Sequence, residues 1–132
     1  MRMDGRNAIV TGASLGIGRA ISTAFAKAGA NVALVARRKE PLEEARAAIA
    51  AAAPSAKLVT IAADIATAEG GQRAYDEATA ALGSIDVVVN NAGASATGKF
   101  TAITDAVWQA DLDLKLFAAI RIARLAMPGM AA

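Results

Sequence analysis

The stretch Thr11-Gly12-Ala13-Ser14-Leu15-Gly16-Ile17-Gly18 links a short apolar run to a helical pattern. Gly12 allows a tight turn, Gly16 lets the backbone approach a phosphate without a Cβ in the way, and Gly18 lets the helix pack close to a sheet. The start of the helix then offers free N–H groups and a partial positive charge to a pyrophosphate. A glycine triplet alone can be only a tight turn, but this one has the strand–turn–helix context of a dinucleotide site.

Strand and helix patterns alternate four times along the chain. Strands are expected at Asn7–Thr11, Asn31–Ala36, Lys57–Ala63 and Ile85–Asn90. Helices are expected at Ile17–Ala28, Pro41–Ala53, Ala66–Leu82 and Asp105–Met127. The alternation predicts one α/β domain over residues 1–132, a partial Rossmann-type doubly wound parallel sheet of four strands with helices on both faces. The expected strand order is 3-2-1-4.

Composition excludes several classes of protein. The chain has no histidine and no cysteine, so no metal site, disulfide, cysteine nucleophile or histidine-based triad is expected. The net charge is only +2, and the basic residues are spread out apart from Arg37-Arg38-Lys39, which argues against nucleic acid as a partner. No apolar stretch reaches about 18 residues, and no signal-peptide core follows Met1. We therefore expect a soluble, cytoplasmic protein with no membrane partner.

The glycine spacing, Gly-x-x-x-Gly-x-Gly, together with Asn90-Asn91-Ala92-Gly93 resembles the short-chain dehydrogenase/reductase family. Asp64-Ile65 and the Trp108-to-Pro128 segment also match. The resemblance covers the N-terminal, cofactor-binding half of the family's fold. It implies an oxidoreductase that transfers hydride between a nicotinamide cofactor and a small carbonyl or alcohol substrate, in a homo-oligomer.

The end of the second strand indicates which cofactor binds. A carboxylate there would accept the ribose hydroxyls of NAD and repel a 2′-phosphate. Ala36 stands at that position and Arg37 follows it, and a guanidinium can hold a phosphate with two parallel hydrogen bonds. Arg38 and Lys39 add positive charge. The sequence therefore favours NADP over NAD, the alternative being an ordinary solvated basic run.

The resemblance implies further cofactor contacts at three loops of the expected sheet. The contacting residues would be Gly12, Ser14, Leu15, Gly16, Ile17, Gly18, Asp64, Ile65, Asn90, Ala92 and Gly93. Asp64 would hydrogen-bond the adenine amino group, or it would cap the third helix, and both roles are compatible. Asn91 would instead brace neighbouring strands.

Catalytic residues are harder to place. By resemblance, proton transfer uses a serine, a tyrosine and a lysine four residues after it, with an asparagine in the preceding helix. The one tyrosine, Tyr75, has Thr79 four residues later, so this constellation is absent and the 132-residue chain alone is expected to be inactive. Lys115 stands in the asparagine's place, either as a site residue or as a solvated helix lysine. The alternative function is a non-catalytic nucleotide-binding module or a degenerate relative.

The fourth strand is expected to form an apolar sheet edge. Bare edges of this kind are sites of pairing or aggregation. We therefore expect the chain to associate through Val87–Val89, through the helix Asp105–Met127, or with a detached C-terminal half of the fold.

Overall fold

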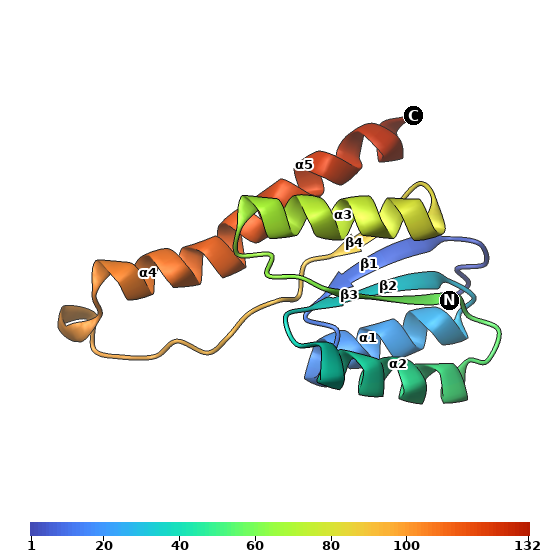
Figure 1. The fold of residues 1–132 in the computed structure, drawn as a ribbon, viewed down its shortest axis with the longest axis horizontal. Coiled ribbons are helices and arrows are strands. Elements are labelled where there is room, and N and C mark those ends of the chain that lie inside the picture. The colour runs from blue at the N-terminus through green and yellow to red at the C-terminus, as the bar shows by residue number, and fades with distance from the viewer.

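The computed structural model describes all residues from Met1 to Ala132, and its four strands form one parallel sheet (Figure 1). The strand order is β3-β2-β1-β4, which confirms the predicted topology. The strands are β1 (Asn7–Thr11), β2 (Asn31–Ala36), β3 (Leu58–Ala62) and β4 (Val87–Val89). Strand β1 lies between β2 and β4, so Ala8 pairs with both Val32 and Val87.

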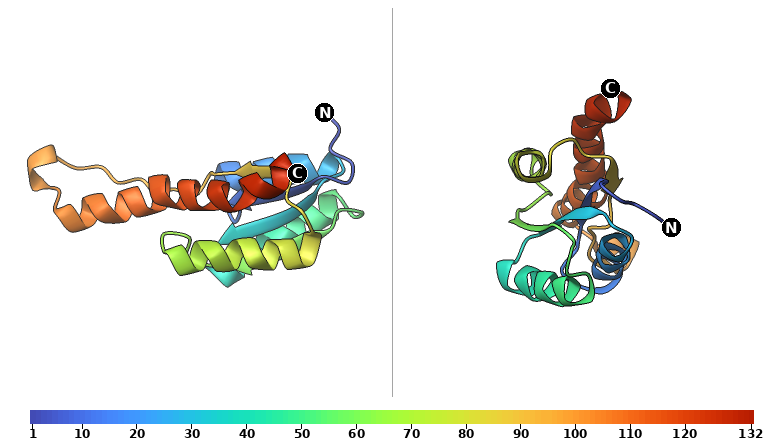
Figure 2. Two further views of the ribbon diagram at one scale, coloured as in Figure 1. Left: turned by 90° about the horizontal axis from the view of Figure 1, so that it is seen from above. Right: turned by 90° about the vertical axis from the view of Figure 1, so that its right-hand side faces the viewer.

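Two pairs of helices cover the two faces of the sheet (Figures 1 and 2). On one face lie α1 (Gly16–Lys27) and α2 (Lys39–Ala52), and on the other lie α3 (Ala68–Leu82) and α5 (Ala118–Ala131). Successive strand residues point to opposite faces. Val10 therefore packs in the core on the α2 side and Ile9 in the core on the α3 side. No helix is both long enough and apolar enough to cross a membrane.

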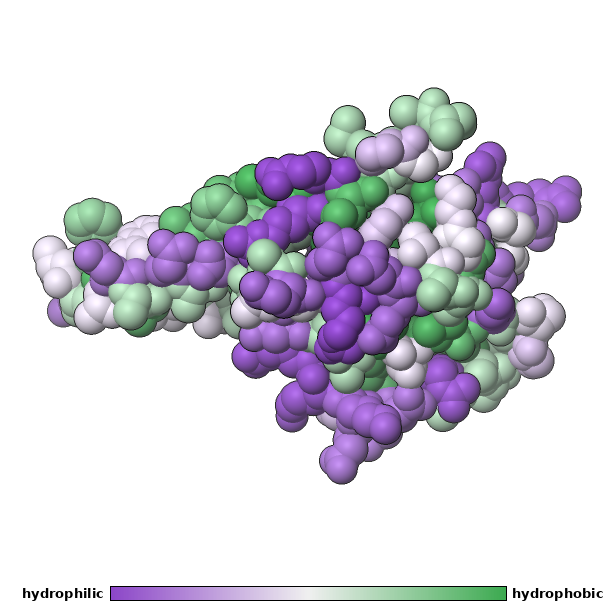
Figure 3. Space-filling view, turned by 45° about the horizontal axis from the view of Figure 1, so that its top comes forward, coloured by the Kyte–Doolittle hydropathy of each residue, from purple (hydrophilic) through white to green (hydrophobic).

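Residues 94–117, here called the arm, project from the rest of the chain, the body (Figures 1 and 2). The arm consists of a loop, a 3₁₀ turn (Phe100–Ala102), helix α4 (Asp105–Leu112) and a π-helical turn (Asp113–Phe117) that leads directly into α5. None of its residues is buried. In the space-filling view it forms the projection on the left, with apolar side chains on its surface (Figure 3).

The expected helix Asp105–Met127 needs correction. The helical path runs on through Pro128 to Ala131 and is interrupted by the π-helical turn, which inserts one extra residue per turn and rotates the helix faces. The helical spacing predicts one side formed by Leu112, Leu116, Ile120 and Ala123 or Arg124, but the first three of these residues are exposed. The side that packs on the body is instead Ala118, Ile122 and Ala126.

The sequence favours packing of Trp108 in the core or against the start of the helix over contact with a ligand, and the structure shows packing near the start of the helix. Its side chain stands edge-on against Phe100, with ring centroids 6.3 Å apart, and the residue is 43% exposed. It is not a core residue because the sheet does not extend beneath α4 (Figure 1). The bounds of the remaining elements differ from the expected ones by no more than two residues.

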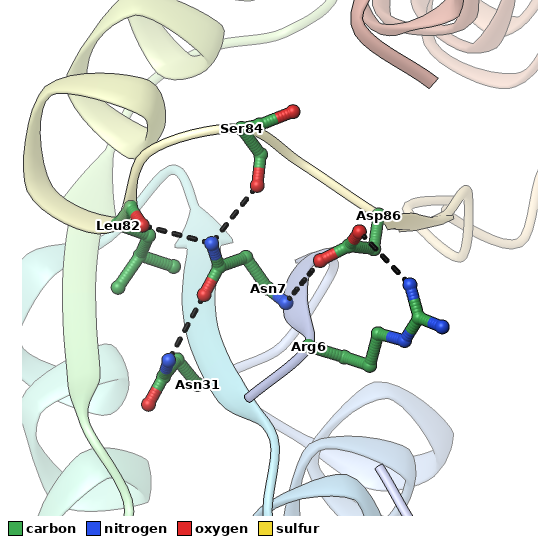
Figure 4. Close-up of polar contacts among 6 residues, drawn as sticks. All are labelled: Arg6, Asn7, Asn31, Leu82, Ser84 and Asp86. Carbon is green, nitrogen blue, oxygen red and sulfur yellow. Dashed lines mark hydrogen bonds and ion pairs between the residues drawn. The ribbon is translucent and has the colours of Figure 1, made fainter. Parts of the chain in front are cut away.

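A polar network fixes the end of the sheet opposite the glycine turn (Figure 4). The side chain of Asn7 donates to the carbonyl oxygens of Leu82 and Ser84 at 2.8 and 2.9 Å and accepts from Asn31. Its backbone N–H donates to Asp86, whose carboxylate also pairs with Arg6. These contacts anchor the turn between α3 and β4 to the first residue of β1.

Candidate cofactor-binding site

A cleft opens at the carboxyl ends of the strands, where the order of the sheet reverses between β1 and β4. Open α/β sheets bind ligands at this switch point. The cleft encloses about 240 Å³. Its lining residues are Gly12, Ser14, Val35, Ala36, Arg37, Arg38, Ile65, Ala92, Gly93, Ala94 and Leu114.

The cleft brings together predicted residues from four separate segments of the chain. These are Gly12, Ser14, Arg37, Arg38, Ile65, Ala92 and Gly93. Val35, Ala94 and Leu114 also line the cleft and were not predicted from the sequence. They are apolar residues of ordinary types, and no spacing in the sequence distinguishes them from the core.

The glycine turn has the geometry expected of a phosphate cradle. Gly12 and Gly16 have φ values of +64° and +54°, in the left-handed region that favours glycine. A Cβ at Gly18 would lie 2.1 Å from the carbonyl oxygen of Gly12, so only glycine allows this close packing of α1. Around Gly16 nothing lies within 4 Å of the Cβ position, so the space on that side is open.

No side chain caps the N-terminus of α1. Leu15 occupies the capping position and its side chain forms no hydrogen bond, so the N–H groups of the first turn stay available for a ligand. The side chains of Leu15 and Ile17 are exposed at the mouth of the turn. Any contact they make with a phosphate would therefore come from the backbone.

Asn91 braces β1 against the end of β4, as expected. Its side-chain amide donates to the carbonyl oxygens of Thr11 and Gly12 at 3.2 and 3.3 Å. Thr11 was not predicted to matter. Its buried hydroxyl oxygen accepts from the backbone N–H groups of Asn91 and Ala92, both at 3.0 Å, and donates to Val89. A hydroxyl residue immediately before the glycine turn is the one signal that could have revealed this role.

Arg37 and Arg38 follow Ala36 at the end of β2, as the sequence indicates. Both are exposed, and neither forms an ion pair within the chain. Two guanidinium groups without acidic partners at the wall of a cleft form a favourable site for a phosphate. No carboxylate stands at the end of β2 itself.

The expectation that Asp64 caps the third helix is wrong. Thr67 is the cap, and its side-chain oxygen accepts from the N–H of Gly70 at 3.0 Å. Asp64 accepts instead from the N–H of Ala66 at 3.1 Å. Its own carbonyl oxygen lies so close to the helix that a Cβ at Gly70 would be 1.8 Å away. Gly70 therefore permits this turn, and Asp64 lies with Arg37 along a second cavity that continues from the cleft.

Lys115 lies in the π-helical turn, beside the β4 end of the cleft. Its ammonium pairs with Asp111, one helical turn earlier, at 2.8 Å. The Lys115 Cε is 3.9 Å from the Cβ position of Gly93. Tyr75, in contrast, lies in α3 and packs against the core on that side of the sheet. The structure thus places the lysine, and not the tyrosine, next to the predicted cofactor residues.

Comparison with known proteins agrees with this geometry. The family model described as short chain dehydrogenase matches residues 6–132. An 11-beta-hydroxysteroid dehydrogenase 1A from Arabidopsis thaliana is 37% identical over 125 residues, which are 94% of this chain and 36% of the plant protein.

Two solved structures are also similar. L-sorbose reductase from Gluconobacter frateurii, complexed with NADPH and L-sorbose, is 37% identical with a TM-score of 0.94, over 98% of this chain and 49% of that one. A metagenomic short-chain oxidoreductase in complex with NADP is 33% identical with a TM-score of 0.90, over 97% of this chain and 57% of that one. The chain therefore spans about half the length of these structures and about a third of the plant relative.

Proposed function

The chain belongs to the short-chain dehydrogenase family, and we propose that it forms the NADP-binding half of an oxidoreductase of that family. The observation that carries this proposal is the pair Arg37 and Arg38 on the wall of the cleft, beside Ala36. Two free cations suit a 2′-phosphate, and the missing carboxylate removes the usual acceptor for the ribose hydroxyls of NAD. The NADPH and NADP bound to the two structural relatives support the same choice.

Different residues of the cleft would contact different parts of the cofactor. The glycine turn and the start of α1 would bind the pyrophosphate, and Arg37 with Arg38 the 2′-phosphate. Asp64 and Ile65 would contact the adenine, and Asn90, Ala92 and Gly93 the adjoining ribose. The bound cofactor supplies hydride transfer to or from a small carbonyl or alcohol substrate.

The test is a calorimetric titration of the chain with NADP and with NAD, repeated on Ala36→Asp. We expect the original chain to bind NADP at least tenfold more tightly than NAD, a difference of about 1.4 kcal/mol or more. Ala36→Asp introduces the carboxylate that accepts ribose hydroxyls and repels the phosphate, so the preference should reverse. Equal affinity of the original chain for the two cofactors would contradict the proposal.

A second candidate function is a non-catalytic nucleotide-binding module. The observations that favour it are Lys115 at the family's asparagine position and Tyr75 on the wrong helix for proton transfer. The mass of the protein in its source separates the two functions. A mass near twice 13.3 kDa would support the oxidoreductase, and a short protein that binds NADP without turnover would support the module.

We also propose that the protein is a homo-oligomer and that the arm contributes to its interface. Phe100, Leu112 and Leu116 are large apolar residues that the arm exposes. Apolar surface gathered on one projecting element is typical of protein–protein contacts. A location in the cytoplasm stays a prediction.

A further inference from the structure

The two members of the ion pair Lys115–Asp111 border different spaces around the cleft. Lys115 borders a small space of about 10 Å³ that it shares with Thr11, Asn90 and Ala92, at the ends of β1 and β4. Asp111 does not border that space; it borders a cavity on the arm and the second cavity, which continues from the cleft past Arg37 and Asp64. Lys115, whose Cε is 3.9 Å from the Cβ position of the cleft residue Gly93, is therefore the member of the pair nearer to the ends of β1 and β4.

The position of Lys115 matters because of the path that the cofactor would take through the cleft. The inference rests on the proposed function, since it assumes that NADP binds there. Arg37 and Arg38 lie on the β2 side of the switch point, and the glycine turn follows β1 in the middle. A dinucleotide whose 2′-phosphate is held at Arg37 crosses the switch point toward β4. Its nicotinamide half thus extends toward the side of the sheet where Lys115 lies.

The two oxidation states of a nicotinamide ring differ by one charge. The oxidised ring is a cation, and the reduced ring is neutral. A fixed cation beside the cleft repels the first and leaves the second unaffected. We propose that Lys115, oriented by Asp111, makes the site discriminate between oxidation states and bind NADPH in preference to NADP⁺. Lys115 is a specificity-determining residue in this proposal and takes no part in proton transfer.

The experiment measures the dissociation constants of NADP⁺ and NADPH for the same chain and forms their ratio. Lys115→Met keeps the length of the side chain and removes the charge, so the ratio of the NADP⁺ constant to the NADPH constant should fall about three- to tenfold, the range for one unit charge in a partly solvated cleft. Lys115→Arg keeps the charge and should preserve the ratio. Asp111→Asn leaves the cation unbalanced and should raise the ratio.

Two controls separate charge from structure. Lys99→Met removes a charge from the arm at a residue outside the cleft lining and should leave the ratio unchanged. Adenosine 2′,5′-bisphosphate, which has no nicotinamide, should bind equally to the original chain and to Lys115→Met. If Lys115→Met weakens both cofactors alike, or fails to fold while Asp111→Asn leaves the ratio unchanged, the inference is overturned. Failure of the original chain to bind either cofactor would instead contradict the proposed function.

Discussion

The body and the arm of this chain both contain large apolar residues, but they differ in how many of them are buried. All 28 buried residues lie outside the arm, in the sheet, the helices that cover it and the segments that flank them. The arm has no buried residue, although it carries six of the twelve large apolar residues that are exposed, Phe100, Val107, Trp108, Leu112, Leu116 and Phe117. The body therefore buries many of its hydrophobic side chains in its own core, whereas the arm buries none and leaves its large apolar side chains available to another surface.

The largest expected contrast is between two leucines. Leu42 in the body is 0% exposed and Leu112 in the arm is 39% exposed. Leu42→Ala should lower the free energy of unfolding by about 2–5 kcal/mol because it leaves a cavity in the core. Leu112→Ala should change it by less than about 0.5 kcal/mol. Urea denaturation at low protein concentration measures both, and a core-like loss at Leu112 would show that the arm is covered in solution.

Nucleotide recognition should also separate the two regions. Arg37→Ala in the body should weaken NADP binding by about 1.5–3 kcal/mol, the range for hydrogen bonds to charged groups, and should leave NAD binding almost unchanged. Lys99→Ala in the arm also removes one positive charge, and it should change the affinity for neither cofactor. Calorimetric titration provides the four affinities. Equal losses for both cofactors in Arg37→Ala would mean that Arg37 acts structurally.

Association should depend on the arm. At micromolar concentration the original chain should sediment as a dimer or larger, and Leu116→Lys should raise its dissociation constant at least tenfold, about 1.4 kcal/mol. Ala48→Lys adds the same charge on an exposed position of α2 and serves as the control. A stable monomer of the original chain, near 13.3 kDa, would rule out this role for the arm.

The smallest effect is expected at the β3 edge of the body. The Thr60 hydroxyl, and then the Arg46 guanidinium, donate hydrogen bonds to Glu43 and lower the pKa of its carboxyl below 4.5. A lowered pKa contributes stability above the unfolded pKa, and this contribution is lost as the pH falls through the folded value. Because the Glu43 side chain is 37% exposed, solvent screening should keep the contribution under about 1 kcal/mol.

The measurement for Glu43 compares unfolding at pH 7 and at about pH 3 for the original chain and for Glu43→Gln. The original chain should lose more stability on acidification than the variant does. Glu44→Gln, one residue later on α2, should behave like the original chain. A variant that loses as much stability as the original chain would show that the hydrogen bonds to Glu43 contribute nothing.

Sequence reasoning predicted the body well for identifiable reasons. The apolar strands and the alternation of strand and helix depend on local periodicity, and together with the glycine turn they indicated a doubly wound fold, whose usual strand order is the one observed. Ala36 and Arg37 could be placed at the cleft because parallel strands end at one common edge. Asn91 was assigned correctly to bracing.

The two errors, at the cap of α3 and in the last helix, share one cause. In both places the local sequence fits more than one arrangement. Asp64 and Thr67 are both good caps, and the helix begins directly after Thr67, whose side chain accepts the hydrogen bond from Gly70. In the last helix, the spacing of Leu112 and Leu116 defines an apolar side without saying whether a sheet lies beneath it. The π-helical turn at Asp113–Phe117 leaves no signal in the spacing of the apolar residues, and it turns Lys115 and the residues after it to new faces.

The hydrogen bonds of Asn7 bear on the order in which the protein assembles during synthesis. Asn7 contacts Leu82, Ser84 and Asp86, which follow it by 75, 77 and 79 residues. Strand β1 leaves the ribosome before the other strands but gains its β4 neighbour only after more than 70 further residues have emerged. Contacts this distant slow folding because the intervening loop must close before they form. We therefore expect β1, α1 and β2 to form an early unit. In that unit the edge of β1 that later pairs with β4 is exposed, and it must not pair with another strand before β4 is synthesised.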